Sequence, residues 1–178
     1  MQTEIIISGF GGQGVLFTGQ LLSYTAMDLG LDVTWFPSYG PEMRGGTANC
    51  TVIIADEEIG SPVVRKPTIA IVMNIPSLDK YEPLVKANGV LVIDSSMVDR
   101  SATREDIQIL ELPATEMAEA MGNKKMTNMF LLGALLKKFP VVPLEAVKKS
   151  LESHMPARHQ NLMQLNFKAL DAGANTVQ

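Results

Sequence analysis

Cysteine is almost missing from this sequence, because Cys50 is the only one among the 178 residues. A single thiol excludes a disulfide within the chain. It also excludes a cysteine-held iron–sulfur cluster or structural zinc, each of which needs about four ligands. Any redox metal is therefore expected on another chain. Cys50 lies on the core-facing side of an alternating apolar segment, and we interpret it as an inert buried thiol, since a nucleophile would need a neighbouring base.

Long apolar runs and an excess of positive charge are also missing. No apolar run approaches the roughly 18 residues of a membrane span, and residues 1–8 show no basic start followed by a long apolar stretch, so we expect no secretory signal. The 15 lysines and arginines are scattered, and the 19 acidic residues bring the formal net charge to −4. This charge balance argues against a nucleic-acid surface. We expect a cytoplasmic protein that binds neither membrane nor nucleic acid.

What the sequence does have is enough apolar content for one substantial core. Hydrophobic residues make up 46% of the chain. At this length, such a composition predicts one domain over residues 1–178 rather than two.

The chain is organised around a strand, a glycine turn and a helix within residues 4–29. Ile5, Ile6 and Ile7 form the β-branched run that is typical of a strand buried on both faces. The period then changes to steps of three and four, which places the next apolar positions on one face of a helix. These positions are Val15, Gly19, Leu22, Ala26 and Leu29. Gly30 is the expected end of this helix.

Between the strand and the helix, Gly9, Gly11 and Gly14 have the spacing GxGxxG, and Gly12 adds further backbone freedom. Glycine allows positive φ and lets a ligand approach the backbone closely. The free N–H groups and the dipole of the helix start favour an anion. The turn is therefore predicted to seat a phosphate or a carboxylate. The alternative is a tight turn that holds no ligand.

The second strand, predicted over residues 33–36, argues against a bound NAD. A dinucleotide site of the NAD type needs an acidic residue at the end of this strand to bind the ribose. The strand ends instead in Pro37 and Ser38, and Asp32 precedes it, at the wrong end.

Residues 37–47, PSYGPEMRGGT, are predicted to form a loop that concentrates contact residues. Two prolines, three glycines and a Tyr–Gly–Pro turn signal break regular structure, yet the loop carries Tyr39, Met43 and Arg44. Because it follows the second strand of a doubly wound sheet, we expect it at the same edge as the glycine turn, where ligands bind. The alternative is a solvated connection whose Glu42 and Arg44 face water.

The rest of the pattern alternates strands with helices and then becomes helical. Strands are predicted over residues 48–55, 62–64, 68–73, 90–93 and 107–112, the first two as an antiparallel hairpin. Helices are predicted over residues 78–86, 116–121, 129–139, 144–155 and 158–172, with Ser77 capping the first and Thr127 or Asn128 capping the third. The predicted fold class is α/β: a Rossmann-like three-layer arrangement with a mostly parallel mixed sheet, an antiparallel hairpin addition and C-terminal helices.

Two polar residues stand just past the carboxyl ends of predicted strands. Asn74 follows residues 68–73 and Asp94 follows residues 90–93, so both are expected at the edge of the glycine turn. Each is able to orient a ligand, and each also suits a helix cap or a turn. His154 and His159 have no acidic partner at ligand spacing, and we interpret both as surface residues.

Four motifs together closely resemble one family. They are GFGGQGV at residues 9–15, FPSYGPEMRGGTANCTVIIAD at 36–56, MNIPS at 73–77 and TNMFLLGAL at 127–135. The combination resembles the gamma subunit of 2-oxoacid:ferredoxin (acceptor) oxidoreductases over nearly the whole chain. The glycine turn paired with SYGPEMRGG at this separation is the specific part. The version YGPEMRGGTANC is more similar to the 2-oxoglutarate enzymes than to the pyruvate enzymes, whose loop more often reads FGPERRGA.

The resemblance implies an enzyme that decarboxylates a 2-oxoacid on thiamine diphosphate and passes two electrons through iron–sulfur clusters to ferredoxin or another acceptor. The acyl group is transferred to coenzyme A. In the family, thiamine diphosphate and magnesium are held by the alpha and beta subunits, and the clusters by beta and a ferredoxin-like delta subunit. This chain is therefore expected to bind none of them alone.

The implied role of the chain in such a hetero-oligomer is structural and gating, as a Rossmann-like wall near the coenzyme A site. The residues that we predict to face the cofactor are Gly9, Gly11, Gly12, Gln13, Gly14, Tyr39, Arg44 and Asn74. No residue is predicted to be catalytic or to bind a metal.

Two alternatives of other classes stay open. One is a self-sufficient nucleotide-binding oxidoreductase, against which the missing ribose acid argues. The other is a non-catalytic assembly protein whose glycine turn is empty. A thermal-shift screen with NAD, FAD and coenzyme A separates them, because the assembly protein responds to none of these ligands.

Overall fold

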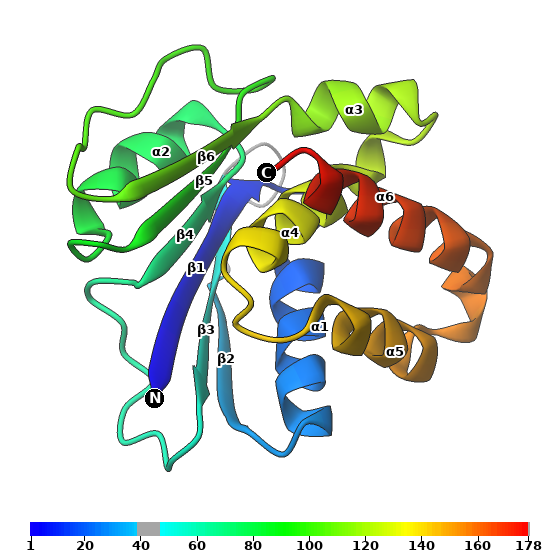
Figure 1. Ribbon diagram of the computed structural model, residues 1–178, viewed down its shortest axis with the longest axis horizontal. Helices are drawn as coiled ribbons and strands as arrows, with labels where there is room; N and C mark the ends of the chain where they lie inside the picture. Colours follow the sequence, from blue (N-terminus) through cyan, green and yellow to red (C-terminus); the bar gives the residue numbers. More distant parts are fainter. Residues whose placement is uncertain (39–46, 178) are drawn as a thin grey trace.

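The computed structural model describes residues 1–38 and 47–177. Within them the chain forms a six-stranded sheet with the order β2-β3-β1-β4-β5-β6 (Figure 1). The strands are β1 (Gln2–Phe10), β2 (Asp32–Ser38), β3 (Thr47–Ala55), β4 (Ile69–Val72), β5 (Val90–Asp94) and β6 (Gln108–Leu112). β3 runs antiparallel to both β1 and β2, whereas β1, β4, β5 and β6 are mutually parallel. The sheet is mixed and mostly parallel, as predicted.

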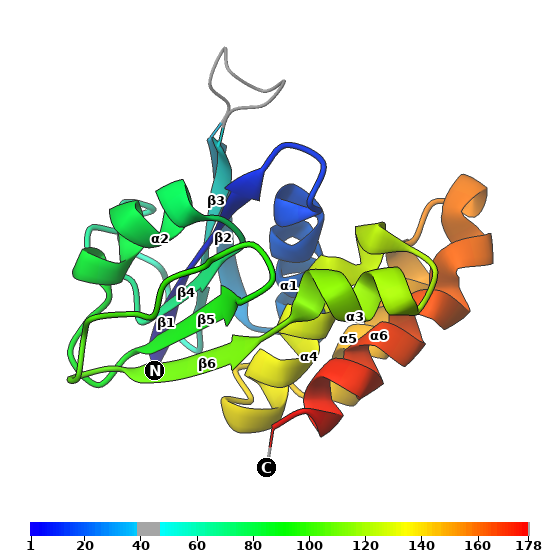
Figure 2. The same ribbon diagram turned by 90° about the horizontal axis from the view of Figure 1, so that it is seen from above.

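Helices cover both faces of the sheet and complete three layers. They are α1 (Val15–Asp28), α2 (Ile75–Tyr81), α3 (Ala114–Ala120), α4 (Thr127–Lys138), α5 (Leu144–His154) and α6 (Met163–Asn175), with 3-10 helices η1 (Glu82–Leu84), η2 (Lys124–Met126) and η3 (Ala157–Leu162). Figure 2 shows α1, α4, α5 and α6 on one side of the sheet and α2 on the other. This arrangement confirms the predicted α/β class.

The centre of the sheet is β1, and its side chains enter two separate cores. Ile5 and Ile7 belong to the large core under α1, α4, α5 and α6, whereas Ile6 belongs to the smaller core under α2. All three are buried. Successive side chains of a strand point to opposite faces, so three consecutive isoleucines stabilise both layers, by roughly 1.5–3 kcal/mol for each fully buried side chain.

The antiparallel hairpin is present, but its strands differ from the prediction. β3 pairs with β2 and β1, and residues 62–64 form no strand. β3 and β4, which this segment connects, each already have a strand on both sides, so the segment finds no free hydrogen-bonding edge beside either of them. Val63 is 70% exposed.

β2 is also longer than the predicted residues 33–36, because Pro37 and Ser38 continue the strand opposite Cys50 and Asn49. Proline lacks an N–H donor and is therefore tolerated in an edge strand, which is the position of β2 in the sheet.

Two predicted helix caps are wrong. Asn74, rather than Ser77, caps α2, because Asn74 Oδ1 accepts a hydrogen bond from Ser77 N at 2.8 Å. The N-cap of α4 is Met126, and no side-chain capping bond is present there. Thr127 and Asn128 lie inside the helix and are buried. Their hydroxyl and amide groups instead serve contacts with other segments.

The apolar helix α4 is buried in the helical layer. Its closest approach is to α6, at Gly133 and Gly173. A Cβ at Gly133 would meet the backbone carbonyl of Leu170, and a Cβ at Gly173 would meet that of Phe130. Only glycine at these positions lets the two backbones come so close.

Candidate functional site

The candidate site is built on the turn between β1 and α1. Gly12 has a φ of 97° and Gly14 a φ of 79°, values that L side chains rarely adopt. Gly11 and Gly12 are exposed. Gly14 is the N-cap of α1, and no described side chain caps this helix start. The N–H groups of the first helical turn are therefore available to an anion. Anion binding itself stays a prediction.

The side chain of Gln13 stabilises the turn through two hydrogen bonds to the backbone. Its Oε1 accepts a hydrogen bond from Phe10 N at 2.6 Å, and its Nε2 donates to the carbonyl of Met73 at 3.2 Å. A Cβ at Gly9 would lie 2.6 Å from Gln13 Oε1 and 2.9 Å from Met73 Cβ. Gly9 and Gln13 therefore shape the turn against the end of β4. Contact of either residue with a cofactor remains a prediction.

Asn74 lies at the same edge, directly after Met73, whose N–H donates to the carbonyl of Ser8. Asn74 is 1% exposed. Its Oδ1 caps α2, whereas its Nδ2 has no hydrogen-bond partner among the described residues. Asn74 therefore acts as a helix cap, which is one of the two roles that the sequence allowed. Its Nδ2 remains a buried donor at the edge of the sheet where a ligand is predicted to bind.

Tyr39 and Arg44 lie outside the described residues, but the ends of their loop do not. Ser38 pairs with Asn49, and Thr47 pairs with Phe10. Since Phe10 is the last residue of β1, the flanking residues Ser38 and Thr47 lie at the edge of the sheet that carries the glycine turn. The predicted position of the loop itself stays a prediction.

Asp32 lies at the ends of the strands that are farthest from the glycine turn. It pairs with Ala55, which also pairs with Gln2 at the start of β1. The glycine turn follows the other end of that strand. Asp32 therefore cannot supply the ribose-binding acid of a dinucleotide site, in agreement with the sequence.

Asn128 of α4 also contacts the glycine turn. From the sequence it is predicted only as a possible helix cap. Its Nδ2 donates to the carbonyl of Gly14 at 3.3 Å and to Thr18 Oγ1 at 3.0 Å. Asn128 is 2% exposed. The sequence does contain a signal for this contact: Asn128 is an amide inside an almost wholly apolar helix, and a buried polar group needs a hydrogen-bond partner.

Two further candidates have structural roles. Burial raises the pKa of Cys50 to about 12, so its thiol is protonated at neutral pH and inert as a nucleophile. Asp94 is fully buried. Its carboxylate accepts hydrogen bonds from Ser96 N at 3.2 Å, Thr115 N at 3.2 Å and Thr115 Oγ1 at 2.5 Å. It therefore closes the turn after β5 and anchors α3.

His154 is exposed, as predicted, but the sequence did not reveal its acidic partner. Its Nε2 lies 3.0 Å from Asp28 Oδ1, and its ring stacks on Tyr24 with centroids 4.4 Å apart. The hydrogen bond from His154 lowers the pKa of Asp28. The contact joins the ends of α1 and α5, which lie far apart in the sequence.

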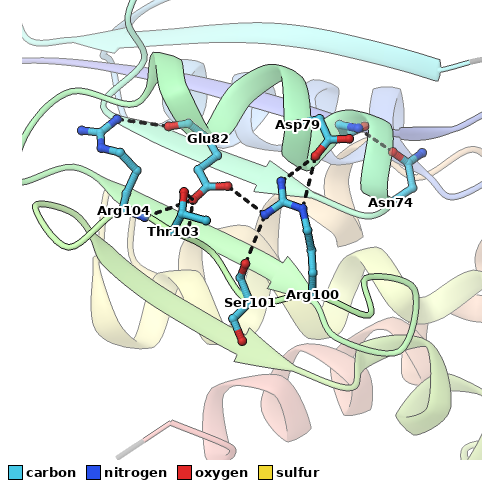
Figure 3. A network of polar contacts seen from close by, with 8 residues as sticks. Asn74, Asp79, Glu82, Arg100, Ser101, Thr103 and Arg104 are labelled. Atoms are coloured by element: carbon cyan, nitrogen blue, oxygen red, sulfur yellow. Dashed lines mark hydrogen bonds and ion pairs between the residues drawn. The ribbon is translucent and has the colours of Figure 1, made fainter.

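A network of polar contacts lies away from the turn, where it holds residues 100–104 against α2 and η1. Figure 3 shows Arg100 between Asp79 and Glu82, with Thr103 on the other side of the Glu82 carboxylate. Burial raises the pKa of Glu82, but hydrogen bonds from Thr103 and Arg100 outweigh burial and leave this pKa below its ordinary value. We assign this network to stability.

Across residues 1–38 and 47–177, no group of three or more His, Cys, Asp or Glu side chains is arranged to hold a metal ion. None of the helices in that part of the chain is both long and apolar enough to cross a membrane.

Comparison with protein families and curated proteins gives consistent matches. A model of the pyruvate ferredoxin/flavodoxin oxidoreductase family matches residues 4–176. The 2-oxoglutarate synthase subunit KorC of Methanothermobacter marburgensis is 35% identical over 184 residues, covering 99% of this chain and 97% of KorC. The ketoisovalerate oxidoreductase subunit VorA of the same organism is 34% identical over 176 residues. The chain spans only 36% of the length of VorA.

Solved structures share the fold. The gamma subunit of a keto/oxoacid ferredoxin oxidoreductase from Geobacter sulfurreducens matches with a TM-score of 0.86 and 29% identity, covering 98% of this chain and 95% of that one. A 2-oxoglutarate:ferredoxin oxidoreductase from Magnetococcus marinus, with 2-oxoglutarate, coenzyme A and succinyl-CoA bound, matches with a TM-score of 0.88. At 21% identity, and with 32% of that chain covered, this second likeness concerns the fold alone.

Proposed function

The chain belongs to the pyruvate ferredoxin/flavodoxin oxidoreductase family, and from this premise we propose that it is the gamma subunit of a 2-oxoacid:ferredoxin oxidoreductase. The observation that carries the proposal is the match to KorC over almost the full length of both chains. The fold of a solved gamma subunit from Geobacter sulfurreducens supports it. The subunit acts within an enzyme and is inactive alone.

The proposed reaction converts a 2-oxoacid and coenzyme A into an acyl-coenzyme A and carbon dioxide. The carbon–carbon bond to the carboxylate breaks, a thioester bond to the coenzyme A sulfur forms, and two electrons pass to ferredoxin or another acceptor with release of the thiol proton. Thiamine diphosphate, magnesium and iron–sulfur clusters supply the decarboxylation and electron-transfer chemistry. We assign them to alpha, beta and delta partner subunits, because one cysteine cannot hold a cluster.

We assign 2-oxoglutarate as the substrate. The loop sequence YGPEMRGGTANC favours it, and several relatives of similar length carry the name 2-oxoglutarate synthase subunit. VorA, whose name specifies ketoisovalerate, has nearly the same identity, so a branched 2-oxoacid is the competing substrate.

The role that we propose for this chain is a wall beside the coenzyme A site. The glycine turn offers uncapped N–H groups at the start of α1, and an anionic phosphate suits such a helix start. Ser38 and Thr47, which flank the loop of residues 39–46, lie at the same edge. We therefore place both the turn and the loop against coenzyme A and the catalytic subunits.

The test is purification of the chain with its partners from the native cell, followed by an assay of acceptor reduction with a panel of 2-oxoacids. We expect copurification of alpha and beta subunits and activity that requires both coenzyme A and 2-oxoglutarate. Preference for ketoisovalerate or pyruvate would overturn the substrate assignment only. Acceptor reduction by the isolated chain, or its purification without partners, would overturn the assignment as a gamma subunit.

A further inference from the structure

The side of the sheet that α2 covers also carries an open apolar surface, over β2 and β3. Phe36 pairs with Thr51, and Thr51 pairs with Ile6, which belongs to the core under α2. Directly paired residues point to the same face of a sheet, so Phe36 faces the α2 side. The helix α2 packs against β4 and β1, whereas β3 and β2 are the next strands outward. Phe36 is 61% exposed.

Phe36 borders a groove of about 370 Å³. The groove is also lined by Val63 and Val64, from the connection after β3, and by Tyr81 and Leu84, from α2 and η1. Val63 is 70% exposed. Scattered exposed apolar side chains need no explanation, whereas apolar side chains grouped around a groove are typical of an interaction site.

The charge at this groove has one sign. Lys80 is among the lining residues, and none of the described residues that line the groove is acidic. Lys80 Nζ lies 5.0 Å from the centroid of the Tyr81 ring, and Arg65 follows Val64 directly. Both cations are exposed, and neither forms an ion pair within residues 1–38 and 47–177. The groove therefore favours an apolar group that is flanked by carboxylates.

On the basis of the function proposed above, we propose that this groove anchors a segment of a partner subunit in which an aromatic or branched apolar side chain lies next to aspartate or glutamate. The apolar side chain enters the groove beside Phe36, and the carboxylates pair with Lys80 and Arg65. A stable interface buries roughly 1,200–2,000 Å² in total, which is more than one groove provides. The groove is therefore an anchor within a larger interface, in which a few residues carry most of the binding energy.

A second copy of this chain fits the groove less well. In a two-fold symmetric dimer the same surface meets itself, so Lys80 and Arg65 would lie close to the same cations of the other copy, and such like-charge contacts are costly. The relative VorA supports a different polypeptide as the occupant. Our chain spans 36% of VorA, so in that protein further polypeptide is joined to the matching region.

The experiment uses the complex purified with its partner subunits. A dilution series of the complex, followed by mass photometry, gives the dissociation constant. We expect Phe36→Ala and Lys80→Glu each to raise this constant about tenfold, as residues at an anchor site do. The loss for Lys80→Glu should be smaller at high salt, because salt screens exposed charges. Both residues are exposed, so neither variant opens the core.

Met27→Ala and Lys168→Glu are the matched controls for the apolar and the charged variant. Both positions are exposed, on α1 and α6, and Figure 2 shows these helices on the other side of the sheet. We expect both controls to leave the dissociation constant unchanged.

A photo-reactive benzophenone amino acid in place of Val63 identifies the occupant of the groove in the same purified complex. We expect a cross-link to a partner-subunit peptide in which an aromatic or branched apolar residue lies next to aspartate or glutamate. Mass spectrometry of the cross-linked peptides identifies this segment.

A cross-link to a second copy of this chain or to a partner peptide without carboxylates, or no cross-link in an intact complex, would overturn the docking groove. A dissociation constant that either Phe36→Ala or Lys80→Glu leaves unchanged would also overturn it. The proposed function would survive these results if the complex still reduced its acceptor in a coenzyme A-dependent reaction. Purification of the chain without partners would overturn both proposals, so the two failures are distinguishable.

Discussion

The side-chain amide of Asn128 donates a hydrogen bond to the backbone carbonyl of Gly14 over 3.3 Å. This contact joins α4 to the residue at which the glycine turn becomes α1. It also leaves no room for a larger residue at position 14, because a Cβ at Gly14 would collide with the Asn128 amide.

We predict that Gly14→Ala lowers the free energy of unfolding by more than about 2 kcal/mol, from the left-handed φ and the collision together. Gly12→Ala is the matched control: its φ is also positive, at 97°, but no atom lies within 4 Å of the added Cβ. It should cost only about 1–2 kcal/mol from its backbone conformation. Urea denaturation followed by the fluorescence of Trp35, the single tryptophan, measures both. Equal losses would show that Asn128 moves away without cost.

The sequence predicts those parts of this fold that depend on neighbouring residues. The parallel strands β4 and β5 are short continuous apolar runs, and such runs are typical of strands covered on both faces. Gly30 and Gly122 end their helices with positive φ, as expected of glycine there. Local chemistry is sufficient for these features.

Apart from the two helix caps, the main errors concern partners that are distant along the chain. Whether residues 62–64 join the sheet depends on the free edges left by other strands, which no local pattern encodes. The bond from Gln13 to Met73 spans 60 residues, and the bond from Asn128 to Gly14 spans 114. A glutamine in a glycine turn therefore looks like a ligand contact in the sequence, whereas the structure shows that it also holds the turn.

The contact between α4 and α6 gives a second prediction. Gly133→Ala should lower the free energy of unfolding by about 1–3 kcal/mol, because the new Cβ meets the carbonyl of Leu170. Alanine is the better helix former by about 1 kcal/mol, and we expect the collision to exceed that gain. Gly60→Ala, with no atom within 4 Å of its added Cβ, is the control in the same urea assay. A stabilised Gly133→Ala variant would contradict close packing of the two helices.

A third prediction concerns Arg44, which lies outside the described residues, in the loop that starts at Ser38 and ends at Thr47 beside the turn. The guanidinium group presents a planar fork to a carboxylate or phosphate, which lysine cannot reproduce. We expect Arg44→Lys to weaken subunit assembly or to raise the KM for coenzyme A about tenfold, while the Tm of the isolated chain stays unchanged. Arg65→Lys, at an exposed position, is the control. A lower Tm with normal activity of the complex would make the loop an internal clamp instead.

The last prediction is a pH dependence that originates at Glu82. The folded protein holds the pKa of Glu82 below its ordinary value near 4.5, so the folded state binds this proton less readily than the unfolded state. The stabilisation by Glu82 is therefore complete above the unfolded pKa and is lost as the pH falls through the lowered folded pKa.

Glu82→Gln should cost about 2 kcal/mol at pH 7, because the buried side chain loses charge-assisted hydrogen bonds from Thr103 and Arg100. Urea denaturation between pH 3 and 7 should show this difference shrinking toward the acid end. Glu58→Gln, at an exposed position, should follow the wild type throughout. A difference for Glu82→Gln that stays constant across the range would show that the charge of Glu82 is not what stabilises this network.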